Sequence, residues 1–256
     1  MKAPAELMDL TGKVAVVTGA SRGIGRAVAE GFALAGADVV IASRKLDACQ
    51  TAASEIEAAT GRRALPVACH VGRWDDAELL LDTVYDNFGR CDVLVNNAGT
   101  SPVYDGMKSV TAELYDKVHA VNARGPFRLS ALFGTRMAEG DGGSIINVTS
   151  AGSLRPSHTD LPYAMAKAAL NALTLALAGT WAPKVRANLV MPGAFDTGMS
   201  QAWGSEAQAQ AASMNPMKRI GQPEDLRGLC VFLASDAASY INGAQILADG
   251  GLFRTL

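Results

Sequence analysis

The sequence predicts an α/β fold, a doubly wound parallel sheet of seven strands with helices on both faces. Seven short runs rich in β-branched residues alternate with longer Ala- and Leu-rich stretches along the 256 residues. The first runs are apolar throughout, as expected of strands covered on both faces. A repeated strand–helix order also implies right-handed crossovers, which place parallel strands side by side.

The elements follow one another along the chain. Strands are expected at 13–20, 37–44, 64–71, 91–99, 143–150, 185–193 and 244–251, and helices at 24–35, 47–60, 75–88, 111–138, 162–180 and 223–234. Residues 194–222 fit neither pattern, and a long irregular segment in a compact fold is usually a binding loop or lid. No linker or change in composition divides the chain, so residues 1–256 are expected to form a single domain.

Composition and charge exclude several classes of protein. The chain is 49% hydrophobic and 19% charged, with a formal net charge of −2. Nucleic acid is not an expected partner, because proteins that bind it present a basic surface. Residues 1–13 lack the apolar core of a signal peptide, and the one long apolar helix carries polar residues, so a cytoplasmic protein without a membrane partner is expected.

The cysteines are widely separated and have no paired spacing. Buried free thiols in a reducing compartment are the favoured interpretation, and disulfides or a metal site are the alternatives. The four positions are Cys49, Cys69, Cys91 and Cys230. No metal is expected.

A glycine-rich turn, TGASRGIG (18–25), lies between the first expected strand and the first expected helix. Glycine at this place lets backbone amides approach a pyrophosphate at the positive end of the helix. The spacing is GxxxGxG, and any tight strand–helix turn favours glycine, so the position of the turn carries the interpretation. A Rossmann-like cofactor site is predicted here, formed by Gly19, Ser21, Arg22, Gly23, Ile24 and Gly25.

The end of the second strand indicates which nicotinamide cofactor binds. Folds that prefer NAD place an acidic residue there, where it binds the ribose 2′-hydroxyl. This chain has Ser43, Arg44 and Lys45 instead, and Arg22 adds a cation from the glycine turn. NADP(H) is therefore the expected cofactor, with NAD(H) as the second choice. The alternative interpretation is a solvated basic corner.

The helix expected at 162–180 begins with Tyr163 and Lys167, which are four residues apart and share one helix face. A free phenol has a pKa near ~10, and a cation within reach lowers it by roughly 1–3 units, towards the range useful for proton transfer. The pair indicates acid–base chemistry. The alternative is an aromatic side chain that merely packs at the start of a helix.

Six motifs in this order resemble the short-chain dehydrogenase/reductase family over nearly the whole chain. They are TGASRGIG (18–25), NNAG (96–99), VNARGPF (121–127), INVTS (146–150), YAMAK (163–167) and PGAFDT (192–197). The resemblance implies a catalytic group of Asn122, Ser150, Tyr163 and Lys167. Tyr163 would give its proton to a ketone oxygen, Ser150 would hydrogen-bond the same oxygen, and Asn122 would hold a water that relays protons to Lys167.

The resemblance also implies further cofactor contacts. Asn96, Ala98 and Gly99 of the NNAG motif would line the adenosine and nicotinamide-ribose wall. Pro192, Gly193 and Thr197 of the PGAFDT motif would hold the nicotinamide carboxamide. The chain departs from the family at His70, where many members have an aspartate that contacts adenine, although a neutral imidazole can hydrogen-bond there too. Beyond the glycine turn, the implied contacts are Ser43, Arg44, His70, Val71, Asn97, Ala98, Gly99, Tyr163, Lys167, Pro192, Gly193 and Thr197.

The resulting functional prediction is an oxidoreductase that transfers a hydride between NADP(H) and a small ketone or secondary alcohol. ASRK (42–45) and CHVG (69–72) resemble NADPH-dependent carbonyl reductases, so a carbonyl or 3-oxoacyl reductase is expected. The alternative is a catalytically silent nucleotide-binding sensor or scaffold of the same fold. The complete catalytic group argues against it, because such proteins usually lose the Tyr or the Lys.

Residues 195–217 contain five large apolar side chains in an Ala-, Gln- and Ser-rich stretch. This composition predicts a mobile apolar lid over the substrate, and a subunit contact is the alternative. The five are Phe195, Met199, Trp203, Met214 and Met217.

The helix at 162–180 predicts an assembly. Its polar residues, Tyr163, Lys167, Asn171 and Thr174, form one stripe and leave Ala, Leu and Met around the rest. One side can pack on the sheet, and the opposite side would expose an apolar patch, which monomers rarely do. Alanines, Ala164 among them, would let two backbones approach closely. A homotetramer is expected, as the family resemblance also implies, with a dimer as the alternative.

Overall fold

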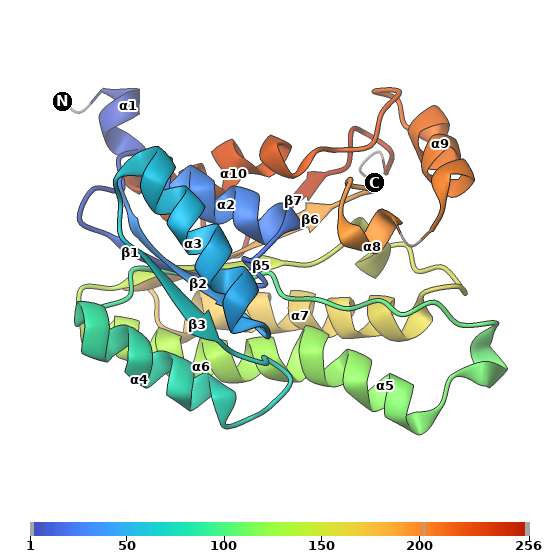
Figure 1. The fold of residues 1–256 in the computed structure, drawn as a ribbon, viewed down its shortest axis with the longest axis horizontal. Coiled ribbons are helices and arrows are strands. Elements are labelled where there is room, and N and C mark those ends of the chain that lie inside the picture. The colour runs from blue at the N-terminus through green and yellow to red at the C-terminus, as the bar shows by residue number, and fades with distance from the viewer. Residues whose placement is uncertain (1–2, 202, 254–256) are drawn as a thin grey trace.

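The computed structural model describes residues 3–201 and 203–253, in which seven parallel strands form one sheet (Figure 1). The strand order is β3-β2-β1-β4-β5-β6-β7. The strands are β1 (Val14–Thr18), β2 (Asp38–Ser43), β3 (Ala64–Ala68), β4 (Val93–Asn96), β5 (Gly143–Val148), β6 (Val185–Pro192) and β7 (Gln245–Ala248). The predicted doubly wound, Rossmann-like fold is confirmed.

Helices cover both faces of the sheet (Figure 1). One layer contains α2 (Gly23–Leu34), α3 (Leu46–Thr60) and α10 (Arg227–Ala234), and the other contains α4 (Asp76–Phe88), α6 (Gly125–Glu139) and α7 (Leu161–Thr180). Alternate residues of β1 serve opposite layers, because Ala15 packs with the first layer and Val14 with the second. This double burial explains why the run is apolar throughout.

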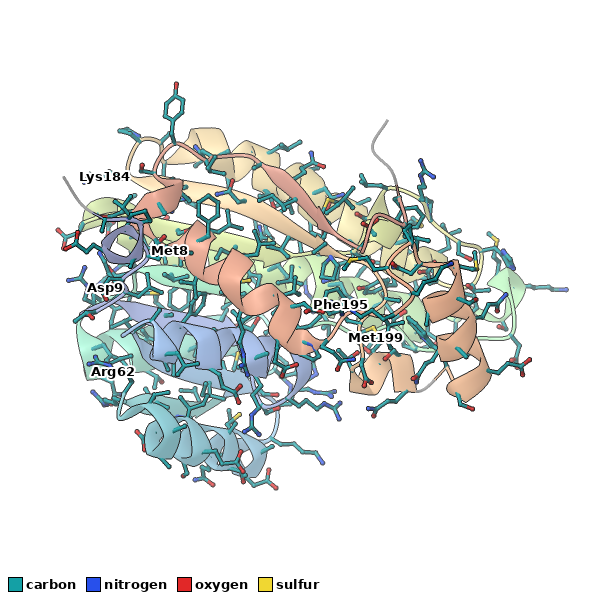
Figure 2. All side chains as sticks on the ribbon, turned by 90° about the horizontal axis from the view of Figure 1, so that it is seen from above. Met8, Asp9, Arg62, Lys184, Phe195 and Met199 are labelled. Carbon is teal, nitrogen blue, oxygen red and sulfur yellow. The ribbon has the colours of Figure 1, made fainter. Side chains whose placement is uncertain are left out.

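The strands are parallel, so their carboxyl ends share one edge of the sheet. The strand order reverses between β1 and β4, and open α/β sheets bind ligands at such a point. Figure 2 shows Phe195 and Met199, which follow β6, at the opposite end of the molecule from Lys184 and Arg62. Lys184 and Arg62 precede β6 and β3, so they mark the amino edge.

The single helix expected at 111–138 is interrupted by a π-helical turn. Helix α5 (Ala112–His119) leads into the turn (Ala120–Arg124), and α6 follows. Pro126 has no N–H to donate to the carbonyl of Asn122, four residues earlier, so regular α-helical bonding cannot continue through this point. The turn leaves Asn122 completely buried.

Residues 194–222 are more regular than expected, because they contain α8 (Gly198–Gln201) and α9 (Ser205–Met214). The periodicity of α9 gave no signal, since none of its residues is buried. The expected helix at 223–234 begins as a 3₁₀ turn before α10. The other short helices are α1 (Pro4–Leu7) and the 3₁₀ turns η1 (Met107–Ser109), η3 (Ala151–Ser153), η4 (Pro223–Leu226) and η5 (Asp236–Ala238).

Helix α7 turns its polar stripe inwards. Lys167 and Thr174 are buried, and the Thr174 hydroxyl accepts a hydrogen bond from Asn147 Nδ2 of β5 at 2.7 Å. Met165 and Leu175 lie on the outer side, 45% and 51% exposed, so the predicted apolar patch is present. Ala164 is buried and does not belong to it. By length and composition α7 passes as a membrane span, but its buried polar contacts are those of a core helix.

Candidate active site

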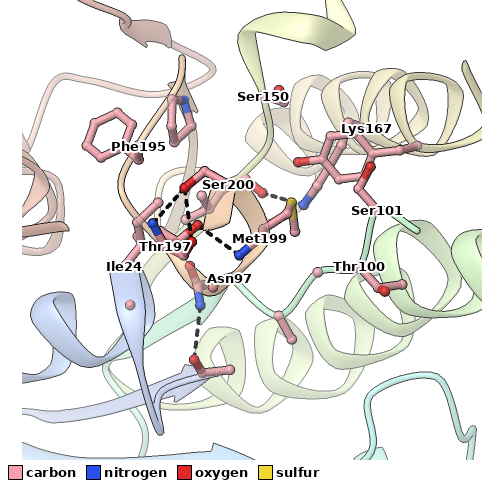
Figure 3. A pocket seen from close by; sticks show the side chains of 18 of the residues that line it. Ile24, Asn97, Thr100, Ser101, Ser150, Lys167, Phe195, Thr197, Met199 and Ser200 are labelled. Carbon is pink, nitrogen blue, oxygen red and sulfur yellow. Dashed lines mark hydrogen bonds between the residues drawn. The ribbon is translucent and has the colours of Figure 1, made fainter. Parts of the chain in front are cut away.

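A cavity of about 680 Å³ opens at the carboxyl edge of the sheet, between the glycine turn and the amino end of α7. All of the expected cofactor-contact residues except Asn96 line it, and so does Ser150. Figure 3 shows Ser150 and Lys167 on one side of this cavity, across from Ile24 and Thr197. The cavity therefore brings together residues from the ends of six strands, β1 to β6, and from α7.

The glycine turn is held against the end of β4 with no spare room. A Cβ on Gly25 would lie 2.3 Å from Asn97 Nδ2 and 2.6 Å from the carbonyl oxygen of Gly19. Gly19 itself has a φ of +67°, in the left-handed region that favours glycine. Asn97 Nδ2 donates to the carbonyl of Thr18 at 2.9 Å, and the Asn97 N–H donates to the Thr18 hydroxyl at 3.0 Å. The turn is thus a rigid backbone surface at the amino end of α2, the arrangement that binds phosphate.

The two asparagines of the NNAG motif have different roles. Asn96 does not line the cavity, because its Nδ2 donates into the interior, to Ser130 Oγ at 3.0 Å and to Asn147 Oδ1 at 2.8 Å. An adenosine contact by Asn96 is therefore wrong. Asn97 faces the cavity and braces the glycine turn.

Two guanidinium groups stand at the adenosine end of the cavity. Arg22 and Arg44 are exposed, and neither forms an ion pair within the described part of the chain. Between them the Ser21 and Ser43 hydroxyls are joined by a hydrogen bond of 3.2 Å. Guanidinium groups bind phosphate oxygens through paired N–H donors, so this corner suits a phosphate on the ribose.

His70 lies in the same part of the cavity with a defined tautomer. Its Nδ1 accepts the Gly72 N–H at 3.1 Å, so the neutral ring carries its proton on Nε2. The backbone N–H of His70 donates to Asp76 Oδ2 at 2.8 Å. His70 therefore presents a donor where the aspartate of the resemblance would present an acceptor.

Lys167 is 2% exposed and points along α7 towards the end of β5. Its Nζ donates to the carbonyl of Val148 at 2.8 Å and lies 5.7 Å from the centre of the Tyr163 ring. A Cβ on Gly99 would lie 3.7 Å from Lys167 Nζ and 3.0 Å from Asn122 Oδ1. Gly99 is therefore the surface that both of these side chains approach.

The expected lowering of the Tyr163 pKa is wrong for the protein by itself. Burial raises the pKa of Tyr163 to about 12, the hydrogen bond to Ser150 acts against this rise, and the charge of Asp160 adds to it. Burial also lowers the pKa of Lys167, to about 8. Both shifts have one cause, because removing water disfavours the charged form of each group. Spacing along a helix cannot show this.

Asn122 does not line the cavity, and its side chain forms hydrogen bonds with the backbone of neighbouring segments. Its Oδ1 accepts the Thr100 N–H at 3.2 Å, and its Nδ2 donates to the carbonyls of Thr100 at 2.8 Å and Val118 at 2.9 Å. The side chain therefore holds the loop that follows β4, and any contact with water falls to the Asn122 carbonyl.

Three of the five apolar side chains predicted to form a lid at 195–217 line the cavity. They are Phe195, Met199 and Trp203, and Trp203 is 45% exposed. Phe195 is 7% exposed and packs beside Gly221, where no Cβ would fit. Met214 and Met217 are exposed away from the cavity.

The cavity also contains residues that sequence reasoning missed. They include Ser101, Val103, Thr159, Asp160, Leu252 and Phe253. Asp160 had a usable signal, because it stands one helical turn before Tyr163 at the start of an expected helix. The others come from loops, whose contacts depend on distant segments.

Comparison with known proteins finds similar oxidoreductases over nearly the whole chain. A family model described as Enoyl-(Acyl carrier protein) reductase matches residues 19–253. The 2-dehydro-3-deoxy-D-gluconate 5-dehydrogenase of Pseudoalteromonas atlantica is 39% identical over 253 residues, which cover 96% of this chain and 98% of that protein. Dehydrogenase/reductase SDR family member 4 of Homo sapiens is 34% identical over 245 residues, 94% of this chain and 88% of that one.

A solved structure shows the same likeness. The L-sorbose reductase of Gluconobacter frateurii, complexed with NADPH and L-sorbose, superposes with a TM-score of 0.92 at 33% identity. The match covers 98% of this chain and 100% of that one.

Proposed function

The chain belongs to the short-chain dehydrogenase/reductase family, an NAD(P)-dependent oxidoreductase family, and on that premise we propose that it interconverts a ketone and a secondary alcohol with NADP(H) in this cavity. One observation supports this most. The cavity has Arg22 and Arg44 without ion-pair partners in the described residues at one end, and Ser150, Tyr163 and Lys167 at the other. A dinucleotide phosphate fits this layout, with its phosphates at the cations and its nicotinamide beside the proton donor.

The residues of the cavity fit the cofactor on local grounds. The glycine turn leaves no side chain between the backbone amides of α2 and a pyrophosphate. His70 has an Nε2–H donor available for an adenine acceptor. When bound, NADPH supplies the hydride that reaches the carbonyl carbon.

Tyr163 is the proton donor of the proposed reduction. With its pKa raised to about 12, the phenol keeps its proton throughout the neutral range and can pass it to the carbonyl oxygen. The Ser150 hydroxyl oxygen accepts the Gly152 N–H at 3.1 Å, which fixes the oxygen and leaves its own proton to point elsewhere. Ser150 and Tyr163 would thus hold one substrate oxygen between them.

Lys167 and Asn122 are proposed to replace the proton that Tyr163 gives away. Lys167 uses one N–H on the Val148 carbonyl, so it retains donors for a ribose hydroxyl beside Tyr163. The Asn122 carbonyl lacks an N–H donor from Pro126 and would hold the relaying water. The side chain of Asn122 keeps that turn in place.

The substrate is proposed to be a small ketone, as for a carbonyl or 3-oxoacyl reductase. The test is a turnover assay with NADPH and NADH on hydroxyketones, dicarbonyls and 3-oxoacyl thioesters, with cofactor binding followed by fluorescence. We expect turnover on at least one class and a higher kcat/KM with NADPH. Tight NADPH binding without turnover on any of them would instead support a nucleotide sensor.

We also propose that residues 1–256 form one cytoplasmic domain that assembles as a homotetramer. The outer face of α7, with Met165 and Leu175 exposed beside alanines, supports a helix contact across a two-fold axis. Light scattering should show a tetramer, and Leu175→Glu should reduce it to a smaller species. Leu34→Glu, on α2 and 66% exposed, is the matched control that should leave the assembly unchanged. A monomeric wild type would refute this account of α7.

A further inference from the structure

Asp160 brings a carboxylate to the substrate end of the cavity. It lines the cavity together with Tyr163, the proposed proton donor, and its charge is close enough to raise the pKa of Tyr163. Its own pKa is raised, mainly because burial removes part of its water. A half-buried acid beside a proton donor is unusual in a site meant only for apolar ketones.

The missing side chain of Gly152 lies between Asp160 and Ser150. A Cβ at this position would be 3.3 Å from Ser150 Oγ and 3.5 Å from Asp160 Oδ2. Ser150 Oγ and Asp160 Oδ2 therefore flank the same glycine, and both residues line the cavity. A substrate whose carbonyl oxygen is held by Ser150 would bring the group on its neighbouring carbon towards Asp160.

A local structural role uses only part of this carboxylate. Asp160 Oδ1 accepts the Ser157 N–H at 3.2 Å. Asp160 occupies the N-cap position of α7, yet its side chain makes no capping hydrogen bond there. Oδ2 is the oxygen on the Gly152 side.

We propose that Asp160 is a specificity-determining residue that selects ketones with a hydroxyl group on the carbon next to the carbonyl, and that it rejects a carboxylate at that place. The proposal rests on the function proposed above. The Asp160 carboxylate accepts the hydrogen bond of this neighbouring hydroxyl while Ser150 and Tyr163 hold the carbonyl oxygen.

The charge of Asp160 favours a neutral hydroxyl over a carboxylate or an alkyl group at this place. A carboxylate would lie against Asp160 and leave two anions in a poorly hydrated space. An alkyl group would displace water from the half-buried Asp160 carboxylate without offering it a hydrogen bond.

Three ketones of nearly equal size test the proposal directly. Hydroxyacetone carries the hydroxyl, butan-2-one replaces it with a methyl group, and pyruvate replaces the hydroxymethyl group with a carboxylate. The wild type should reduce hydroxyacetone roughly 10–100-fold better in kcat/KM than butan-2-one, the range expected for a hydrogen bond to a charged group. Pyruvate should be the poorest of the three.

Two variants separate recognition from helix capping. Asp160→Ser and Asp160→Asn both keep a good N-cap residue. Asp160→Ser should bring the two neutral ketones within about threefold of each other, mainly through loss of hydroxyacetone reduction. Asp160→Asn should show a preference for hydroxyacetone over butan-2-one between those of the wild type and Asp160→Ser. It should also reduce pyruvate better than the wild type does. Calorimetry of propane-1,2-diol and butan-2-ol binding to the NADP⁺ complex should show the same loss of preference without turnover.

The outcomes are distinct. A wild type that reduces both neutral ketones equally, or an Asp160→Ser variant that keeps the wild-type preference, overturns the role of Asp160 and leaves the proposed function standing. A uniform fall for all three ketones with weaker NADPH binding assigns Asp160 a structural role and also overturns the proposal. Absence of turnover on every ketone, with NADPH still bound, overturns the proposed function and the role of Asp160 together.

Discussion

The two ends of the cavity are built in different ways. At the cofactor end, the backbone of the glycine turn packs directly against the end of β4. No added atom fits between the residues that pack there, Thr18, Gly19, Gly25 and Asn97. At the substrate end, loops and the short helix α8 contribute side chains, and Trp203 is partly exposed. Tyr163 stands where the two meet.

This difference separates what the fold requires from what the substrate selects. The cofactor end tolerates little change, because its shape is set by strand ends that also hold the sheet together. The substrate end can change its side chains while the sheet stays intact, so substrate choice should depend on it. The predictions below test this division in order of decreasing effect.

Tyr163→Phe should have the largest effect. Removing only the hydroxyl should lower kcat by roughly 10²–10⁴, the usual contribution of a positioned acid–base group, because the ring keeps its packing. Steady-state kinetics measures kcat, and NADPH fluorescence should show a Kd close to the wild-type value. A variant that keeps a tenth or more of the wild-type kcat would contradict the role of Tyr163.

The buried Lys167 should make the free energy of unfolding depend on pH. Its pKa falls from 10.5 to about 8 on folding. Below pH 8 the folded protein therefore keeps a buried ammonium group, which lowers its stability. Between pH 8 and 10.5 the unfolded chain binds more protons, so stability rises with pH by roughly 3 kcal/mol from this group. Lys167→Met removes the titration, and its stability relative to wild type should decline over that window.

Denaturant unfolding at a series of pH values measures this difference. Tyr163 is present in both proteins, so its own titration cancels from the comparison. A difference between the variant and the wild type that stays flat from pH 8 to 10.5 would show that Lys167 is not desolvated in the folded protein.

Gly25→Ala tests the packed backbone of the cofactor end. The new Cβ would overlap Asn97 Nδ2 and the Gly19 carbonyl, so we expect roughly 10–100-fold weaker NADPH binding and about 1–3 kcal/mol lower stability. Gly228→Ala in α10 is the control, because nothing lies within 4 Å of its Cβ position. It should be neutral or stabilise the helix by about 1 kcal/mol. Equal behaviour of the two variants would show that the turn can relax.

Arg44→Asp tests the charges at the same end without touching its backbone. One reversal removes an attraction and adds a repulsion, so the preference for NADPH over NADH should fall by at least roughly 10-fold in kcat/KM. Arg63→Asp is a control, because Arg63 contacts Asn87 away from the cavity. A wild type that prefers NADH would refute the assignment of Arg22 and Arg44 to a phosphate.

The smallest effect is expected at the substrate end. Trp203→Ala should raise the KM of the ketone a few-fold, because the substrate loses one apolar contact. The Kd of NADPH should stay unchanged. Hydrogen exchange of residues 203–214 should slow when cofactor and substrate are both bound. Equal exchange with and without them would argue for a fixed subunit contact rather than a lid.

Much of the fold and of the site was predictable from local pattern. Apolar runs and helical stretches located the seven strands and the main helices, because the period of side chains along the chain depends only on the element that holds them. The same periodicity paired Tyr163 with Lys167, and parallel strands brought Ser150 and the glycine turn to one edge. The resemblance to a family added the roles that spacing could not supply.

Other properties depended on contacts between segments far apart in the chain. The pKa directions of Tyr163 and Lys167, the inward direction of Asn96, the burial of Phe195 and the place of Asp160 could not be read from neighbours in sequence. Each reflects how much water is excluded and which distant atom stands nearby, and both are set when the layers close. The sequence alone determined which elements form and which chemistry they carry. The tertiary structure decided which groups lose water and which oxygen faces the substrate.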